Sequence, residues 1–312
     1  MEKRTRNVKI AITGASGFIG QYTVLELNAK GHRMVLLGRE RRKLDSAFYS
    51  NRIPFQLIET DYGHSLEKTL KGTDALIHLA GLRYQKERGM ADYVTNNILI
   101  TDRIFHAAAQ SGIRNIVFAS TIAVYNSWVN ALPFTEDQNC FPPTPYGISK
   151  LTCEKIAYWY DLKFGTKIKS LRIGQAIGAE EREGYMVNTM IGQASRKETL
   201  TVWGRGSGTR DYVYVKDVAH AITAALELPE QSGVFNIGCG EPISHLRLAE
   251  AINRAFGNKG NLKMDPGKME DAVPFFMSIK KAERELGWKS RWNLESMLAD
   301  MANDDGHHLH SK

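Results

Sequence analysis

Cysteine is scarce in this sequence. The 312 residues include three cysteines, Cys140, Cys153 and Cys239, and their spacing fits no zinc site. A small core held together by disulfides or by a structural metal is therefore excluded, and we expect no bound metal. Unpaired thiols are typical of a reducing compartment, which predicts a cytoplasmic protein.

Long apolar segments are missing as well. No uninterrupted apolar run approaches the ~20 residues that a membrane-spanning helix needs. The first seven residues are not followed by the apolar stretch of a secretion signal. We therefore expect no membrane partner. The hydrophobic content of 43% is enough for one large or two linked folded units.

The chain also lacks the charge pattern of a nucleic-acid-binding protein. Its formal net charge is +7, but no basic helix and no stripe of mixed basic and aromatic residues accompanies the excess. We expect an anionic small molecule as the partner, and no nucleic acid.

Strand-like and helical patterns alternate in the first half of the chain. The predicted strands are 8–13, 33–37, 55–59, 75–79, 116–119 and 168–173, with helices at 22–30, at 92–111 and from Tyr146 onward. Such alternation predicts a parallel sheet covered by helices on both faces. Beyond Gly174 the pattern is less regular: a flexible glycine loop at 204–208, strands at 210–215 and 234–237, and a helix at 218–228.

A glycine-rich turn follows the first predicted strand. It reads Gly14-Ala15-Ser16-Gly17-Phe18-Ile19-Gly20 and leads into a helical pattern. Glycines here permit a tight backbone, close approach of a pyrophosphate and close helix packing, while the helix N-terminus attracts phosphate. Strand, glycines and helix stand in the order that a dinucleotide site requires.

A phenol and an ammonium group stand four residues apart in Tyr146-Gly147-Ile148-Ser149-Lys150. On a helix, both side chains lie on one face. The pKa of a free tyrosine is about 10, and a nearby positive charge lowers it. Reaching ~7 requires about 4 kcal/mol of differential stabilisation. Lys150 together with a nicotinamide cation is suited to provide it, which makes Tyr146 a candidate proton carrier.

Together these motifs resemble the extended short-chain dehydrogenase/reductase family, the NAD-dependent epimerase/dehydratase group, of the nucleotide-sugar-modifying type. Further fragments carry the resemblance through most of the chain. They are His78-Leu79-Ala80-Gly81, Asn97, Ser120-Thr121 with Val124-Tyr125, Arg172, Arg210-Asp211-Tyr212-Val213, Asn236-Ile237-Gly238 and Glu285-Leu286-Gly287-Trp288.

The resemblance implies an α/β fold with two parts. One is a doubly wound, parallel-sheet Rossmann domain at 1–174, to which 211–240 return. The other is a smaller mixed α/β substrate-binding lobe at the C-terminal side, formed by 175–210 and 241–312. We also expect a homodimer.

In this family a serine or threonine at the end of the fifth strand joins the tyrosine and the lysine. Ser120 and Thr121 are the candidates here, and the spacing to Val124-Tyr125 favours Thr121. Neighbouring strand residues face opposite sides, so only one hydroxyl can face the nicotinamide. The implied catalytic residues are Thr121, Tyr146 and Lys150. Ile122-Ala123 replace the acid-base pair of the family's dehydratases, so elimination of water is not expected.

A bound dinucleotide is implied as well. NAD sites usually carry an acidic residue at the end of the second strand, where this chain has Gly38-Arg39. Arg39 suits the 2′-phosphate of NADP, or stacks over adenine in an enzyme that accepts NAD; both cofactors stay open, with NADP favoured. The implied cofactor ligands are Gly14, Gly17, Phe18, Ile19, Gly20, Arg39, Asp61, Tyr62, Leu79, Ala80, Gly81, Asn97, Tyr146 and Lys150.

The implied substrate ligands are Thr121, Asn188, Thr201, Trp203 and Arg210. The arginine would hold a diphosphate through its planar fork of donors. Two departures stand out: Gln175 replaces a family asparagine, and Lys263 or Lys268 would have to replace a second phosphate-binding arginine.

The sequence therefore predicts an NAD(P)-dependent epimerase or keto-reductase acting on a small molecule, a nucleotide sugar, with Tyr146 as acid and base. Two alternatives remain. One is a non-catalytic dinucleotide-binding protein that senses redox state or acts as a scaffold. The other is a reductase of a carbonyl substrate without a nucleotide.

Overall fold

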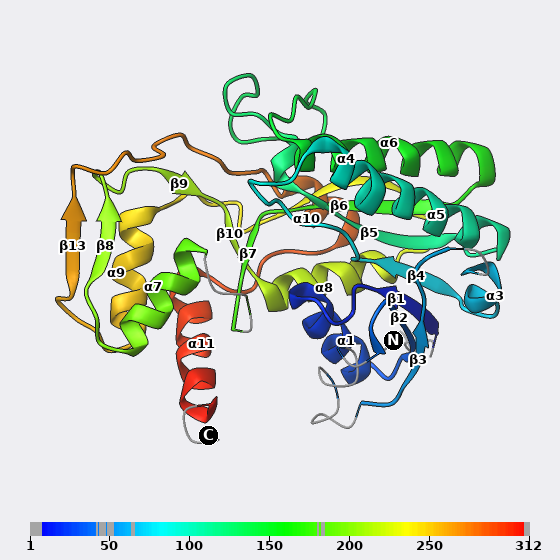
Figure 1. Ribbon diagram of the computed structural model, residues 1–312, viewed down its shortest axis with the longest axis horizontal. Helices are drawn as coiled ribbons and strands as arrows, with labels where there is room; N and C mark the ends of the chain where they lie inside the picture. The colour runs from blue at the N-terminus through cyan, green and yellow to red at the C-terminus, as the bar shows by residue number, and fades with distance from the viewer. Residues whose placement is uncertain are drawn as a thin grey trace.

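The computed structural model describes residues 8–41, 43, 48, 53–63, 66–179, 181 and 185–308. Its centre is a seven-stranded, wholly parallel sheet in the order β11-β6-β5-β4-β1-β2-β3 (Figure 1). These strands are β1 (Lys9–Thr13), β2 (Arg33–Gly38), β3 (Phe55–Glu59), β4 (Ala75–His78), β5 (Asn115–Thr121), β6 (Lys167–Ile173) and β11 (Gly233–Ile237). The predicted doubly wound α/β fold is confirmed.

Helices cover both faces of the sheet (Figure 1). Helices α1 (Phe18–Ala29) and α8 (Val215–Leu226) lie on one face, and α5 (Ile100–Gln110) and α6 (Pro145–Phe164) on the other, with the short α3 (Leu66–Leu70) beside α5. Thr144 caps α6 by accepting a hydrogen bond from the Gly147 N–H at 3.1 Å, and Pro145 occupies its first turn.

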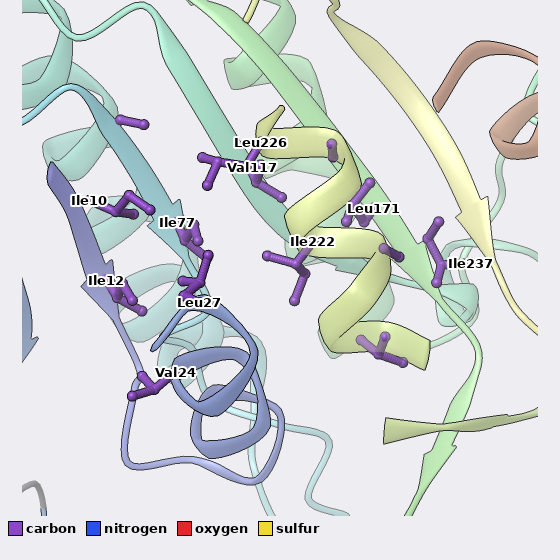
Figure 2. Packing of buried hydrophobic residues seen from close by; sticks show 14 of the residues in the cluster. Ile10, Ile12, Val24, Leu27, Ile77, Val117, Leu171, Ile222, Leu226 and Ile237 are labelled. Carbon is purple, nitrogen blue, oxygen red and sulfur yellow. The ribbon is translucent and has the colours of Figure 1, made fainter. Parts of the chain in front are cut away.

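Alternating side chains of the strands build two cores. Ile10 and Ile12 pack on the α1 and α8 side together with Val24 and Ile222, as Figure 2 shows. Ala11, between the two isoleucines, belongs to the cluster under α5 and α6. Both faces of the strand are therefore buried, as expected for a parallel sheet between helices.

Two predicted elements are wrong in detail. The helix expected at 92–111 is interrupted: α4 (Met90–Tyr93) and α5 are separated by a π-helical turn, η1 (Val94–Leu99). The strand expected at 210–215 is divided into β9 (Thr209–Arg210) and β10 (Tyr212–Tyr214), which pair with different partners. Asp211 divides them because its buried carboxylate accepts the N–H groups of Cys239 and Met277.

A second group of elements lies beside the large sheet (Figure 1). It contains the strand pairs β7–β10, β8–β13 and β9–β12 and the helices that pack on them. The remaining bounds are β7 (Gln175–Ile177), β8 (Leu200–Trp203), β12 (Ile243–Ser244), β13 (Leu262–Asp265), α7 (Met186–Ser195), α9 (His245–Ala255), α10 (Lys280–Leu286), α11 (Leu294–His308) and the 3-10 turn η2 (Ile122–Val124).

The second group has its own apolar core, with Leu200, Val202, Leu248 and Leu298 among its buried residues. It draws on both segments that the sequence assigned to a substrate lobe, and also on Tyr212 of the returning segment. The domain boundaries remain a proposal. Among the described helices, none has the length and apolar character needed to cross a membrane.

A lysine is buried at the start of strand β6. The ammonium group of Lys169 donates to the side-chain oxygen of Asn115 at 2.6 Å and to the carbonyl of Leu228 at 3.2 Å. Burial lowers the pKa of Lys169 from 10.5 to about 7, although the negative charge of Glu230 acts to raise it. The folded protein therefore holds this proton more weakly than the unfolded chain does.

This difference predicts a pH-dependent stability. Between about pH 7 and pH 10 the unfolded chain binds more protons at Lys169 than the folded protein, so stability should rise with pH, by at most about 1.4 kcal/mol per pH unit. We expect the free energy of unfolding in urea to rise by about 2 kcal/mol more in the wild type than in Lys169→Met between about pH 7 and pH 9. Parallel profiles of the two proteins would contradict the assignment.

Candidate active site

The sheet reverses its strand order between β1 and β4. From β1 the chain proceeds outward to β2 and β3, and then returns to place β4 on the other side of β1. Ligands of open α/β sheets bind at the carboxyl ends of the strands at such a point. A cavity of about 500 Å³ lies there. Its lining includes Gly14, Gly17, Phe18, Ile19, Gly20, Arg39, Tyr62, Leu79, Ala80 and Gly81 of the predicted cofactor ligands.

The glycine turn has the geometry that a dinucleotide needs. Gly14 has φ +72°, and a Cβ there would lie 2.6 Å from the Ala80 nitrogen. A Cβ on Gly20 would lie 2.2 Å from the Gly14 carbonyl oxygen. Gly17 is the N-cap residue of α1, whose first N–H groups and positive dipole end attract phosphate. Larger residues at Gly14 or Gly20 would collide with the backbone of the protein itself, so these glycines keep the turn compact and leave the start of α1 suited to a pyrophosphate.

Helix α6 carries Tyr146 and Lys150 to this edge. A Cβ on Gly147 would lie 2.3 Å from the carbonyl oxygen of Ala123, so the helix start presses closely against the turn that follows β5. This contact brings the Tyr146 phenol close to the Thr121 hydroxyl, which acts to lower the pKa of the phenol. The sequence predicted that these side chains meet, and in the structure they do.

Ser120 and Thr121 use their hydroxyls differently. Ser120 donates to the buried carboxylate of Glu154 at 2.5 Å. Thr121 accepts from the N–H of Ala123 at 3.2 Å and contacts Tyr146. The alternation of the strand therefore leaves Thr121 at the candidate site, as the sequence favoured.

The charge that acts on the tyrosine differs from the expected one. Burial raises the pKa of Tyr146, while the hydrogen bond to Thr121 and the charge of Arg83 lower it. The ammonium group of Lys150 donates to the Ala119 carbonyl at 2.7 Å and lies 4.7 Å from the centre of the Phe118 ring. Arg83 was not singled out from the sequence, although it follows the His78 to Gly81 fragment.

Arg83 also connects the two sides of the cavity. Its guanidinium lies 5.0 Å from the centre of the Tyr185 ring and 3.7 Å from the carboxylate of Glu181. Its carbonyl accepts from Tyr93, whose ring lies 6.1 Å from that of Tyr146. Arg83 and Tyr185 both line the cavity.

Asn97 supports the cavity wall. Its side-chain oxygen accepts from the Leu82 N–H at 2.6 Å, and its amide donates to the Leu82 carbonyl and to the Ser149 hydroxyl, each at 3.0 Å. These bonds join the loop after β4 to helix α6. Asn97 lies in the π-helical turn η1, a feature that is frequent near functional sites.

An uncharged histidine, His78, holds the residue that precedes the glycine turn. His78 hydrogen-bonds through Nδ1 to Thr13 at 2.7 Å and through Nε2 to Thr101 at 3.0 Å. Burial lowers the pKa of His78 to about 3, so the ring stays uncharged at neutral pH. Thr13 precedes Gly14 directly. The histidine thus ties the end of β1 to α5.

Asp61 and Tyr62 face different spaces. Tyr62 lines the cofactor cavity. Burial raises its pKa to about 12, although the positive charge of Arg39 acts to lower it. Asp61 accepts from the Gly63 N–H at 2.8 Å and lines a second hollow beside α3 and α5. The predicted contact of Asp61 with the cofactor remains a prediction.

The candidate substrate arginine is held by protein groups. Arg210 donates to the carbonyls of Thr209 at 2.8 Å and Val273 at 2.7 Å, and pairs with the carboxylate of Asp271. A substrate diphosphate would compete with Asp271 for this guanidinium.

The glycine loop at 204–208 binds a carboxylate of the chain itself. Glu270 accepts from the N–H of Arg205 at 2.8 Å, the N–H of Gly208 at 2.7 Å and the Ser207 hydroxyl at 3.0 Å. Hydrogen bonds from the Gly208 and Arg205 N–H groups lower the pKa of Glu270 to about 2. The loop is therefore anchored, where the sequence predicted a flexible segment.

The other predicted substrate ligands lie on β8 and α7. Trp203 at the end of β8 is 55% exposed, and the ammonium group of Lys268 lies 5.8 Å from the centre of its ring. Thr201 stands opposite Lys263 of β13. Asn188 donates its amide to the carbonyl of Glu181 at 2.7 Å. Lys263 and Lys268 both lie near residues of β8. The substrate-binding roles of these residues stay predictions.

Residues 10–238 match the model of the NAD dependent epimerase/dehydratase family. The chain belongs to this family. It is similar to UDP-glucose 4-epimerase 2 of Arabidopsis thaliana, with 32% identity over 94% of each chain. The motif-based resemblance to the extended short-chain dehydrogenase/reductase type is confirmed, and the chain is an enzyme of that type.

Solved structures agree with this membership. UDP-N-acetylglucosamine 4-epimerase from Bacillus cereus superimposes with a TM-score of 0.85 at 32% identity, over 95% of this chain and 96% of its own. UDP-glucuronic acid 4-epimerase from Bacillus cereus, solved in complex with NAD, has a TM-score of 0.83 at 26% identity, over 97% and 100% of the two chains.

Proposed function

We propose that this member is a UDP-sugar 4-epimerase that retains NAD. The observation that carries the proposal is the proximity of Tyr146 and Thr121 at the sheet edge where the glycine turn lines the cavity. The family relatives are named for 4-epimerisation of UDP-glucose, UDP-N-acetylglucosamine and UDP-glucuronic acid, which supports the substrate class and the reacting carbon.

We assign a separate chemical role to each residue of the site. A bound dinucleotide would supply reversible hydride transfer at the sugar carbon, and the configuration there would invert when the hydride comes back to the opposite face. Thr121 holds the sugar hydroxyl by a hydrogen bond, and Tyr146 removes its proton and later gives it back. Arg83 favours the phenolate through its charge. Lys150, whose ammonium group donates to the carbonyl of Ala119 in the cavity wall, is assigned the binding of a ribose hydroxyl.

Conversion of UDP-glucose to UDP-galactose without added cofactor is the direct test. Protein purified without added nucleotide should release NAD on denaturation, identified by mass spectrometry. Released NAD with turnover supports the epimerase. An empty site that takes up NADPH and reduces a keto-sugar would favour the keto-reductase. Nucleotide binding without turnover of any UDP-sugar or carbonyl substrate would favour the non-catalytic protein.

Arg39 provides a separate prediction on cofactor choice. Its place at the cavity after β2 suits a 2′-phosphate. We expect Arg39→Ala to weaken NADPH binding by about 1.5–3 kcal/mol, the scale of a hydrogen bond to a charged group, and to leave NADH nearly unchanged. Titration of the nucleotide-free protein with both cofactors measures this. Equal losses would indicate that Arg39 packs on adenine and does not distinguish the two cofactors.

We also propose a homodimer formed through helix α6. Tyr158 and Leu162 on its outer face are 64% and 68% exposed, and Trp159 between them is 46% exposed. An apolar strip of this kind suits contact with a second copy. Light scattering after gel filtration should give the mass of a dimer, and Leu162→Glu should reduce it to that of a monomer. A monomeric wild type would contradict the proposal.

A further inference from the structure

Helix α6 carries a third polar side chain on the face of Tyr146 and Lys150. Glu154 follows Lys150 by four residues, as Lys150 follows Tyr146, so the three side chains form a row along the helix. Glu154 is buried, with 5% of its surface exposed. A carboxylate is rarely buried without partners, and its contacts therefore indicate what it does.

Both oxygens of Glu154 are bound by Arg172 of strand β6. The Nε–Oε1 distance is 3.0 Å and the Nη2–Oε2 distance is 2.7 Å. The hydroxyl of Ser120 donates to Oε1 at 2.5 Å. Ser120 and Arg172 are direct neighbours in the register of β5 and β6, so helix α6 is fastened to two adjacent strands at one level.

The network continues from the arginine into the loop after β5. Nη1 of Arg172 donates to the hydroxyl of Tyr125 at 2.7 Å. That hydroxyl lies 2.9 Å from the side-chain oxygen of Asn236 on β11. Ser120, Arg172, Tyr125 and Asn236 are all buried. The fastening point thus joins α6 to three strands of the sheet.

Stability alone is a weak reason for this arrangement. Buried ion pairs lose about as much through desolvation as they gain, and apolar residues of similar size often replace them without loss of stability. A two-point contact between a planar guanidinium and a carboxylate instead fixes both the distance and the orientation of helix α6 relative to strand β6. The contact is one residue from Thr121 along β5 and two helical turns from Tyr146 along α6.

We propose that the Glu154–Arg172 pair is a positioning device that sets the height and rotation of helix α6 so that Tyr146 meets Thr121. A helix that slips by one residue moves about 1.5 Å along its axis and turns by about 100°. Misplacement of a reacting group by about 1 Å can cost 10²-fold in rate. The inference rests on the proposed acid-base function of Tyr146, and neither Glu154 nor Arg172 lines the cofactor cavity.

Glu154→Gln in the full-length, NAD-loaded enzyme is the first test. We expect kcat for UDP-glucose epimerisation to fall by about 10²-fold, while KM and the NAD content stay within about twofold of the wild type. Asp161→Asn is the matched control, because Asp161 pairs with Lys167 at 2.8 Å and joins the far end of α6 to β6. The control should keep its kcat. An unchanged kcat in Glu154→Gln would overturn the proposal.

The double variant Glu154→Leu/Arg172→Met separates position from stability. It fills the site with apolar groups, so its Tm should equal or exceed that of Glu154→Gln. We expect its kcat to remain about 10²-fold below the wild type. Recovery of kcat together with Tm would show that the pair serves stability only, and would overturn the inference. If Glu154→Gln does not fold, this variant alone decides.

Tyr146→Phe distinguishes this inference from the proposed function. An active Tyr146→Phe protein would remove the proposed acid-base role of Tyr146 and the inference with it. An inactive Tyr146→Phe protein beside a fully active Glu154→Gln protein would remove the inference alone.

Discussion

Tyr146→Phe should lower kcat for UDP-glucose epimerisation by about 10²–10⁴-fold, the usual effect of losing general acid-base assistance. The substitution removes one oxygen atom and leaves the ring, which packs beside Tyr93, in place. NAD content should therefore stay at the wild-type level. Initial rates with UDP-glucose and UDP-galactose, together with the nucleotide released on denaturation, measure both effects.

Tyr160→Phe is the matched control. It is the same change on the same helix, and the hydroxyl lost there donates to the side chain of Asp102 at 3.0 Å, among the residues of the core under α5 and α6. This control should lower Tm slightly and keep kcat. If Tyr146→Phe and Tyr160→Phe behave alike, Tyr146 is not the proton carrier.

Arg210→Ala should lower kcat/KM for a UDP-sugar by about 10²-fold or more, since each hydrogen bond to a charged group contributes about 1.5–3 kcal/mol. Binding energy from a remote diphosphate also positions the reacting carbon, so kcat should fall as KM rises. Any weak activity on a free sugar should remain. Affinity for UDP alone, measured by calorimetry, should fall with kcat/KM.

The structure supplies a competing explanation, because Arg210 also holds the carbonyls of Thr209 and Val273. Thermal unfolding of Arg210→Ala therefore accompanies the kinetics. Arg196→Ala is a suitable control, since Arg196 forms an exposed ion pair with Glu198 at 2.7 Å. Equal losses on the UDP-sugar and on the free sugar would make Arg210 a structural residue.

The sheet could be predicted from the sequence because its strands are short apolar runs separated by turn signals. The strand at 55–59 was predicted at its observed bounds, and most others within one or two residues. The glycine turn was equally readable, since Gly14 and Gly20 stand where a Cβ would collide with backbone atoms. Local patterns of this kind need no knowledge of distant contacts.

The features that the sequence did not predict share a physical cause, which is contact between residues far apart in the sequence. Strand 210–215 is divided because the carboxylate of Asp211 binds backbone groups near 239 and 277. Loop 204–208 is fixed by Glu270, more than sixty residues later. Arg83 affects Tyr146 only because folding brings the ends of β4 and β5 together. No local periodicity reports such pairs.

The two neighbouring hydroxyls of β5 have a consequence for anyone who alters this protein. Ser120 belongs to the framework and Thr121 to the proposed chemistry, and a single step along the strand turns a side chain to the opposite face of the sheet. An inserted or deleted residue within β5 would therefore swap their surroundings while leaving the composition almost unchanged. Chimaeras with related enzymes should join outside this strand. The exposed segment around Trp128 is a more tolerant junction, because that side chain is 83% exposed.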